Sequence, residues 1–341
     1  MKVKQWRGVI SSFAIKALTE VGILVPLIIG LIISFGIMNP LFLSLGNLKS
    51  VLLQTTYLGI LTMGEMLPLI VGGFDMSIGT LIAFTSVVAT LTMKMEIFAD
   101  PTAMVILGIL AGLLVGLGIG LFNGLIIAFL KVDAFVVTIG SMSICAGAAF
   151  VITRGHPVFG LPEVFKTTLG KGGIIGGVSL PFLIMIGIAI GMFMLINWTH
   201  VGRFWWAIGG NIKGAIHSGI ATRKYTLLAY VICSLLASGS AVLLTARAGS
   251  GELTMGASLM PQAIAAAVLG GTAIGGGRGN VPGALLGAFF ITMLLNGMNL
   301  IALGSFIQQV VVGTFLLVAI IVDRYLRRLR LRKEAEIWAI D

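Results

Sequence analysis

The segment THVGRFWWAIGGNIKGAIHSGIATRK, residues 199–224, is a polar island between two strongly apolar runs. It carries four Lys or Arg side chains and no acidic residue. In a chain of membrane-spanning helices, a basic segment of this kind is typical of a cytoplasmic loop. The residues after Gly210 and Asn211 are compatible with one or two helical turns. We therefore interpret the island as a cytoplasmic docking site for a soluble partner.

The composition predicts an all-α membrane protein. Of 341 residues, 58% are hydrophobic and only 10% are charged, whereas soluble domains are roughly 25% charged. Apolar runs recur at about 20 residues, the length that crosses a ~30 Å hydrocarbon core. We expect one transmembrane domain, 1–341, with ten spans. The predicted spans are 17–38, 51–71, 78–95, 104–130, 134–153, 179–198, 225–246, 261–275, 281–300 and 305–323.

The distribution of basic residues predicts that both termini are cytoplasmic. With the tails 1–16 and 324–341 inside, 16 of the 22 Lys and Arg residues fall on the inner side, as the positive-inside rule requires. The first span lacks a cleavage site and is expected to be retained. The span 261–275 is only about 22 Å long as a helix, so it is expected to be tilted, broken or re-entrant.

Several function classes are disfavoured. The net charge of +10 does not gather on an aromatic-rich or amphipathic face, so nucleic acid is not an expected partner. Cys145 and Cys233 lie within apolar runs and are expected to be buried small hydrophobes. His156, His200 and His217 fall in loops on both sides, so they cannot form one metal or catalytic site. We expect no catalytic residue, cofactor or metal.

Acidic residues near the second span need a physical reason, because a charge in the membrane core costs at least about 2.5–3.5 kcal/mol. Glu65 and Asp75 flank the sequence around Pro68 and the Gly72–Gly73 pair, where the helix is expected to end or break. Asp75 or Ser77 could cap the start of the third span. Alternatively, these side chains line a pathway or gate at a broken helix.

Amide side chains are the other polar groups within predicted spans. Asn123, Asn296 and Asn299 lie within or at the end of spans, and Gln308 and Gln309 enter the tenth. Such amides usually form hydrogen bonds between helices. The alternative is a path for a hydroxylated solute, which several weak hydrogen-bond partners would pass without holding it tightly.

Glycines form two stripes that predict close helix packing. The stripes are Gly108, Gly112, Gly116, Gly120 and Gly124 in the fourth span, and Gly283 and Gly287 in the ninth. The loop GGTAIGGGRGNVPG, 270–283, has the glycine content of a phosphate-binding loop but lacks the G-x4-G-K-[ST] pattern. We interpret it as a glycine-rich cytoplasmic turn with Arg278 at the lipid face.

Three separated motifs resemble one family, the ribose-permease family of sugar-type ABC importer permeases. GGNIKGAIHSGI, 209–220, resembles the family pattern GGN-x-x-A-A-x-x-SGI of the cytoplasmic coupling loop. GGFDMSIGT, 72–80, resembles GGIDLSVGS. AIAAAVLGGTAIGGGRGNVPGALLGA, 263–288, resembles AIAAVVLGGTSLAGGRGSVLGTLLGA. The likeness extends from about Asn47 to Arg324.

This resemblance implies a permease subunit in the bacterial inner membrane that imports a monosaccharide-like solute. Two permease subunits, identical or different, would surround one pathway. Two separate ATP-binding subunits would dock at the island, so the chain itself would need no nucleotide site. A solute-binding protein would deliver solute to the outer face, where 154–179 is the longest predicted loop.

From the residues and the resemblance together we assign two candidate groups. The coupling residues are Gly209, Gly210, Asn211, Ser218 and Gly219, and the candidate pathway residues are Asp75, Ser77, Asn123, Asn296 and Asn299. One departure is notable, because Ile212, Lys213 and Gly214 stand where the family pattern usually has Glu-Ala-Ala. The competing interpretations are an ion-coupled secondary transporter, with Glu65 or Asp75 as the coupling acid, and a channel-like pore.

Overall fold

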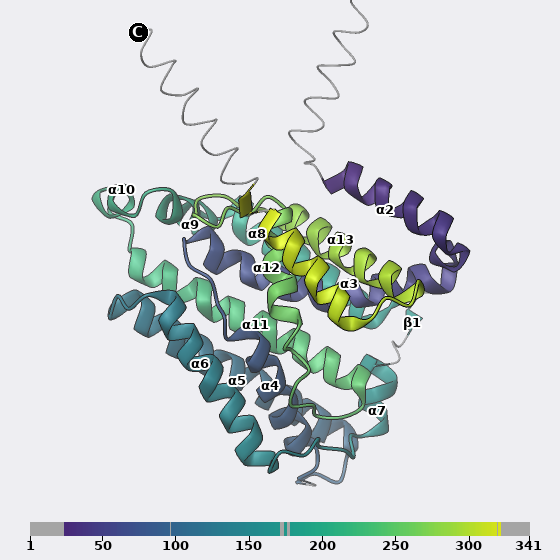
Figure 1. Cartoon of the computed structure of the whole chain (residues 1–341). Helices are drawn as coiled ribbons and strands as arrows, with labels where there is room; N and C mark the ends of the chain where they lie inside the picture. Colours follow the sequence, from purple (N-terminus) through teal and green to yellow (C-terminus); the bar gives the residue numbers. More distant parts are fainter. Residues whose placement is uncertain (1–23, 96, 171–173, 176–177, 319, 322–341) are drawn as a thin grey trace, which may run out of the picture.

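The computed structural model describes residues 24–95, 97–170, 174–175, 178–318 and 320–321 (Figure 1). The helices of the first half are α2 (Leu24–Met38), η1 (Pro40–Leu43), α3 (Leu45–Ile70), α4 (Ile78–Met93), α5 (Pro101–Phe129) and α6 (Ala134–Thr153). Those of the second half are α8 (Leu180–Trp198), α9 (His200–Gly210), α10 (Ile212–His217), α11 (Thr222–Ala248), α12 (Leu259–Leu269), α13 (Val281–Leu300) and the helix Ser305–Val318. The predicted all-α class is therefore confirmed.

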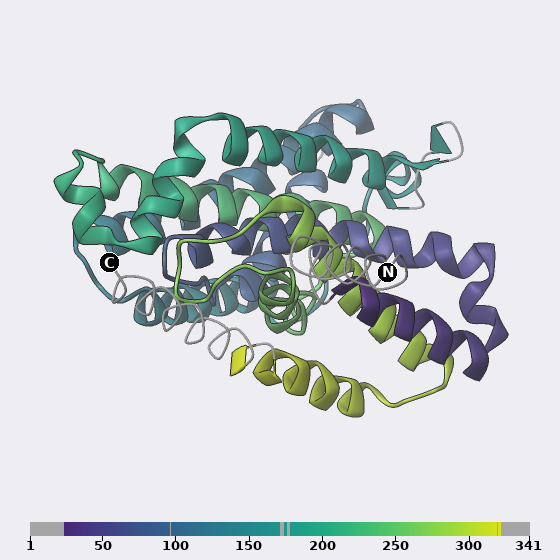
Figure 2. The same cartoon turned by 90° about the horizontal axis from the view of Figure 1, so that it is seen from above.

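Two long helices, α3 and α11, form the centre of the bundle. Figure 2 shows α3 with α8 and α11 alongside it, and α11 also packs on α4 and α5. Every side chain from Thr55 to Ile70 of α3 is buried. The sequence of α11 supports this central position, because small residues such as Ala237, Ser238 and Ala241 let neighbouring helices approach closely.

The glycine stripe of α5 is the seam between α5 and α11. A Cβ atom added to Gly116 would lie 2.3 Å from Ser238 Oγ, and one added to Gly120 would lie 2.8 Å from Val231 Cα. The ninth-span glycines do the same against α12, because a Cβ on Gly287 would lie 1.9 Å from the Ala266 carbonyl oxygen. The prediction of close packing at both stripes is confirmed.

Two short helices, α4 and α12, begin where the chain turns back after α3 and α11. α3 ends at Ile70 and α4 begins at Ile78, so the predicted break around Gly72 and Gly73 is confirmed. The starts of α4 and α12 meet at two glycines: a Cβ on Gly256 would lie 2.0 Å from the Gly79 carbonyl oxygen. The two chain reversals therefore touch near the middle of the bundle.

The helix lengths support part of the predicted span count. Among the described residues, α5, α6, α8, α11 and α13 are long and apolar enough to cross a membrane. α2, α4, α12 and Ser305–Val318 are apolar but shorter, and α3 is long but carries the buried Glu65 and several threonines. The count of ten spans and the sidedness of the termini stay predictions. The tails 1–16 and 324–341 lie outside the described residues.

The predicted span 261–275 needs correction. α12 contains 11 residues, about 16 Å of helix, and it ends at Leu269 rather than at residue 275. The reason is local, since Gly270 is followed by Gly271 with a φ of +88°, a left-handed conformation that glycine adopts without steric cost. Residues 270–280 then form an irregular loop before α13.

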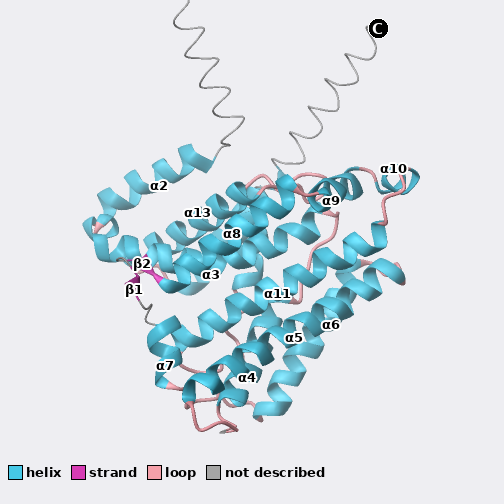
Figure 3. Cartoon of the chain, turned by 180° about the vertical axis from the view of Figure 1, so that it is seen from behind, coloured by secondary structure: helices cyan, strands magenta, loops and turns pink. Residues whose placement is uncertain are grey.

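The loop predicted to face outside has some structure of its own. It contains α7 (Glu163–Phe165), the turn η2 (Lys166–Gly170) and a hairpin of β1 (Ile174–Ile175) and β2 (Val178–Ser179). In Figure 3 this hairpin and α10 lie at opposite ends of the molecule. Gly170 packs against the end of α11, where its added Cβ would lie 2.1 Å from the Ala246 carbonyl oxygen.

Candidate functional site

The polar island folds into two consecutive helices, α9 and α10. Asn211 separates them, and its side-chain oxygen accepts a hydrogen bond from the Gly214 N–H at 3.0 Å, which caps the first turn of α10. Ser218 and Gly219 end α10, with Gly219 at a φ of +76°. Residues 211–219 thus form one short, separately capped helix, in agreement with the one or two helical turns predicted after Asn211.

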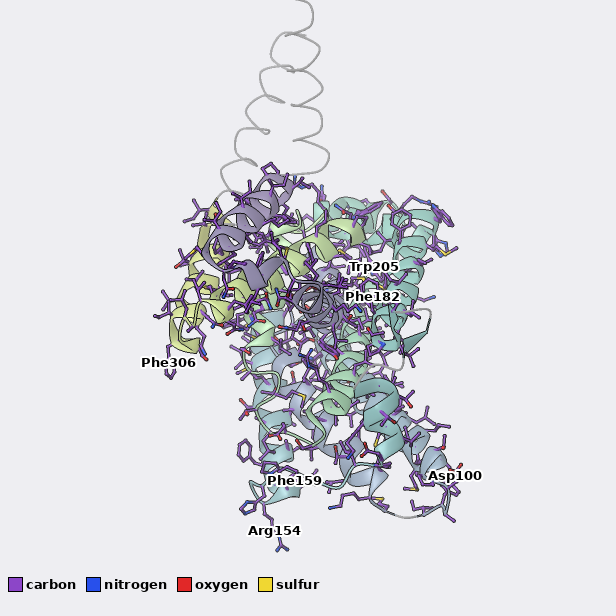
Figure 4. The ribbon with its side chains drawn as sticks, turned by 90° about the vertical axis from the view of Figure 1, so that its right-hand side faces the viewer. Asp100, Arg154, Phe159, Phe182, Trp205 and Phe306 are labelled. Atoms are coloured by element: carbon purple, nitrogen blue, oxygen red, sulfur yellow. The ribbon has the colours of Figure 1, made fainter. Side chains whose placement is uncertain are left out.

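α9 attaches this short helix to the bundle interior. The side chain of Trp205, labelled in Figure 4, is fully buried in an apolar cluster that also contains Ile70 and Ile196. Its indole N–H donates a 2.7 Å hydrogen bond to the Tyr225 carbonyl oxygen, while Trp206 donates at 3.3 Å to the carbonyl oxygen of Gly279. Both tryptophans, whose roles the sequence did not reveal, hold α9 against α11 and the 270–280 loop.

Gly209 brings the backbone of the island into contact with the end of α3. A Cβ atom at Gly209 would lie 1.8 Å from the Ile70 carbonyl oxygen and 2.4 Å from Gly277 N. The Gly277 N–H in turn donates a 2.8 Å hydrogen bond to the Ile70 oxygen. Gly276 and Gly277 have positive φ angles of +82° and +80°. We call this contact of Ile70, Gly209, Gly210, Gly276 and Gly277 the glycine junction.

The glycine junction explains the glycine-rich loop that resembled a phosphate-binding loop. An added Cβ at Gly276 would lie 2.7 Å from the Gly209 carbonyl oxygen, and one at Gly277 would lie 2.9 Å from Gly210 Cα. Only glycine combines the left-handed conformation with so close an approach. The interpretation of 270–283 as a structural turn is supported, and its packing partner is the polar island.

Three of the predicted pathway residues lie together at the reversal between α3 and α4. Asp75 Oδ1 accepts hydrogen bonds from Ser77 N–H at 2.9 Å and from Ser77 Oγ at 2.5 Å. Asn123 of α5 donates to Ser77 Oγ at 3.1 Å and to Asp75 Oδ2 at 3.4 Å. All three side chains are fully buried. Asp75 therefore stabilises the turn that leads into α4, but neither Asp75 nor the N-cap residue Ser77 forms a side-chain capping bond to α4, so the capping interpretation is not supported.

Glu65 completes this buried polar network from α3. Its Oε1 atom accepts a 3.0 Å hydrogen bond from the Asp75 N–H, and its Oε2 atom accepts one from Cys233 Sγ at 3.7 Å. The network therefore joins α3, the reversal, α5 and α11. Cys145 and Cys233 are buried and unbonded to each other, which confirms their predicted burial. We call Glu65, Asp75, Ser77 and Asn123 the buried acid network.

The other two predicted pathway residues lie elsewhere, on α13. The side-chain amides of Asn296 and Asn47 are hydrogen-bonded to each other at 2.9 Å. Asn299 Oδ1 accepts a 2.7 Å hydrogen bond from Gln308 Nε2. These bonds connect α13 with α3 and with the helix Ser305–Val318. They agree with the interpretation that these amides form hydrogen bonds between helices. The five residues do not gather at one place, and their role in a pathway stays a prediction.

Two cavities accompany these features. A cavity of about 970 Å³ separates the α3–α4 reversal and the α5–α6 connection from α10, and Lys131, Asp133, Arg223 and Lys224 are among its lining residues. A second cavity of about 220 Å³ lies between α3, α11, α12 and α13. Neither cavity is predictable from the linear sequence, because each is lined by residues from at least three separated segments.

No metal centre is formed within the described ranges, where no three His, Cys, Asp or Glu side chains lie close enough to hold an ion. His200 instead packs against the aromatic rings of Phe204 and Tyr225.

Comparison with known proteins identifies the family. The family described as "Branched-chain amino acid transport system / permease component" matches residues 47–321. The ribose import permease protein RbsC of Bacillus subtilis is 37% identical over 294 residues, 86% of this chain and 89% of that protein. RbsC of Escherichia coli is 33% identical over 291 residues, 84% and 88% of the two chains.

A third relative, the D-allose transport system permease protein AlsC of Escherichia coli, is 29% identical over 296 residues, 86% of this chain and 88% of that protein. No solved structure matches this chain. The family match covers every residue of the glycine junction and of the buried acid network. The chain therefore belongs to the permease components of the branched-chain amino acid transport family, among which it is similar to ribose import permeases.

Proposed function

We propose that this chain is the transmembrane permease subunit of an ATP-driven importer for a monosaccharide-like solute. The glycine junction carries the proposal, because it links an exposed cytoplasmic helix directly to the chain reversals after α3 and α12. Similarity to ribose and allose permeases supports the solute class. The subunit would lie in the bacterial inner membrane and have no nucleotide site of its own, so ATP-binding subunits would supply the work.

The docking face of the ATP-binding subunit would be α10. Ile212 and Ile216 are four residues apart on this helix and 53% and 55% exposed, so they form one apolar face. Lys213 is also exposed. Because these residues replace the usual acidic pattern, we expect the partner groove to be apolar and to carry an acidic residue that pairs with Lys213.

Force would pass from α10 to the membrane through backbone contacts. A push on α10 reaches Gly209, and Gly209 touches both Ile70 and Gly277. Side chains could absorb a displacement by changing rotamer, whereas backbone atoms in contact must move together. The push would therefore shift the α3–α4 reversal and the 270–280 loop together, and alternating access would follow from rocking of the bundle.

The remaining partners follow from the proposed topology. A solute-binding protein would contact the 154–179 loop, whose hairpin lies at the end of the molecule opposite α10 (Figure 3). A second permease subunit would complete the pathway. The altered residues at Ile212–Gly214 motivate pairing with a different permease. Purification of the intact importer tests this, because two identical copies of this chain in every complex would contradict asymmetric pairing.

Crosslinking tests the docking site. The variant Asn211→Cys should form a crosslink with the ATP-binding subunit in inner-membrane vesicles, and the crosslink should form only when the reagent reaches the cytoplasmic face. Arg154→Cys, in the loop predicted to lie outside, is the matched control and should not crosslink to that subunit. Labelling of Asn211→Cys from the outer face alone would refute the topology and the docking site together.

A second candidate function is ion-coupled transport. The observation that favours it is the buried acid network, in which Glu65 and Asp75 are both fully buried and hydrogen-bonded to each other through the Asp75 N–H. Buried carboxyl groups in membrane proteins are often proton relays. Solute uptake by vesicles separates the two functions: dependence on ATP and indifference to an uncoupler support the importer, and the reverse result supports ion coupling.

A further inference from the structure

The 220 Å³ cavity lies on the side of the bundle away from the glycine junction. Its walls come from α3, α11, α12 and α13, and polar side chains from all four helices line it together with leucines. The polar lining residues are Gln54, Tyr57, Arg247, Gln262 and Thr292. Tyr57 is 13 positions before Ile70 on α3, about 20 Å along the helix axis.

The hydrogen-bonding groups of the side chains that line the cavity are only partly satisfied by one another. Among the described residues, no hydrogen bond joins the side-chain amide of Gln54 or Gln262 to another residue. The Arg247 guanidinium lies over the Tyr57 ring, with Cζ 5.5 Å from the ring centroid, which is a cation–π contact. No carboxylate lines the cavity. The Tyr57 hydroxyl is buried and has no hydrogen-bond partner among the described residues. Because buried hydroxyls normally have a partner, this group is available to a hydrogen-bonding ligand in the cavity.

The size and chemistry of the cavity restrict that ligand. Drug-sized ligands occupy roughly 300–1,000 Å³, so a cavity of about 220 Å³ accepts a smaller solute. Amides and hydroxyls both donate and accept hydrogen bonds, as the hydroxyl groups of a polyol do. Leu58 and Leu295 supply apolar wall for C–H surfaces. The unneutralised Arg247 disfavours a cation.

We propose that this cavity is an outward-facing solute site within a single permease subunit and that it binds one monosaccharide. The proposal rests on the importer function proposed above. It differs from the pathway predicted from sequence, because none of Asp75, Asn123 and Asn296 lines the cavity. Gln54 and Gln262 would bond the sugar hydroxyls, and Arg247 would donate to a ring or hydroxyl oxygen at the entrance.

A cysteine reporter in the full-length chain tests the site. Leu259 lines the cavity and is half-buried, so Leu259→Cys should react with a membrane-impermeant maleimide in right-side-out vesicles. The native Cys145 and Cys233 are buried and give the background rate. D-Ribose or D-allose at about ten times its Kd should slow labelling about tenfold. Maltose, a disaccharide, should not slow it.

Matched variants identify the residues responsible. Adding Gln54→Leu and Gln262→Leu to the reporter should abolish protection by the sugar. Gln309→Leu makes the same substitution at an exposed glutamine outside the cavity and should leave protection intact. The proposal is overturned if neither sugar slows labelling, if protection survives the double substitution, or if the reporter reacts only from the cytoplasmic side.

ATP-dependent uptake in the same vesicle preparation separates failure of this inference from failure of the proposed function. Uptake of D-ribose or D-allose through the intact importer without protection of Leu259→Cys would reject the cavity alone. Protection by sugar without ATP-dependent uptake would support the cavity and reject the importer function.

Discussion

At one end of α3, the Ile70 carbonyl oxygen accepts a hydrogen bond from Gly277 directly beneath the backbone of Gly209. Toward the other end, Gln54 and Tyr57 face a cavity of about 220 Å³. Backbone contact makes the first end a rigid joint, whereas side chains around a space leave the second end free to open and close. Under the proposed function, the same helix would receive movement at one end and admit solute at the other.

The largest effect is expected at the glycine junction. Gly209→Ala places a Cβ atom 1.8 Å from the Ile70 oxygen, whereas a Cβ atom on Gly191, an exposed glycine of α8 outside the junction, meets nothing within 4 Å. Overpacking of this kind costs about 1–3 kcal/mol or more, and the displaced contact should uncouple α10 from α3. ATP-dependent sugar uptake should fall by about 100-fold in Gly209→Ala and stay within twofold or so of wild type in Gly191→Ala. Equal uptake by the two variants would refute the joint.

The next largest effect is expected in the buried acid network. Asp75→Ala removes the acceptor for Ser77 and leaves Asn123 with fewer partners, so the unfolding free energy should fall by about 3 kcal/mol. Asp100→Ala, which removes a cap bond to Thr102 at an exposed helix start, should cost about 1 kcal/mol. Thermal unfolding in detergent measures both. A larger loss for Asp100→Ala would contradict the structural role assigned to Asp75.

A smaller effect is expected at the seam where α5 packs against α11. Gly120→Ala puts a Cβ atom 2.8 Å from Val231 Cα, whereas a Cβ on Gly118, on the other face of α5, meets nothing within 4 Å. Gly120→Ala should destabilise the protein by about 2 kcal/mol. Gly118→Ala should stabilise it by up to about 1 kcal/mol, because alanine favours helix over glycine. Shifts of the same sign in the unfolding midpoint would contradict the assigned seam.

The smallest effect is expected from the amide pair that joins α13 to α3. Asn296→Ala breaks the bond to Asn47, and hydrogen bonds between membrane helices contribute about 0.6 kcal/mol on average. Asn197→Ala, which loses only a bond to Phe193 within its own helix, is the control and should change the unfolding free energy less. If Asn296→Ala instead raises the KM for sugar with unchanged stability, its predicted pathway role is supported.

The features that were predictable from sequence are those encoded by local spacing. The four-residue glycine period of α5, the Gly72–Gly73 break and the short helix after Asn211 all depend on residues close together in the chain. Hydrophobic runs likewise located most helices, although they did not show that Gly271 ends α12 early. Local steric and capping rules act within a few residues, so a single sequence displays them.

The contacts missed from sequence all join distant segments. The sequence around Gly209 does not indicate that Gly209 contacts Ile70 and Gly277, which are 139 and 68 positions away. The cavity polar groups Gln54, Arg247 and Gln262 also looked like isolated polar residues. Their significance depends on helix packing, which brings together segments that the linear pattern describes separately. The excess of glycine in 270–283 was the one sign of these contacts in the sequence, and it was also compatible with an ordinary turn.

The crossing of Gly79 and Gly256 makes the starts of α4 and α12 share a single pivot. Each residue leaves room only for hydrogen, since a Cβ atom on Gly256 would lie 2.0 Å from the Gly79 oxygen. A methyl group added at this contact would displace both short helices at once. Amide exchange at this pair would consequently report when the two halves of the bundle separate, without a probe attached to either surface.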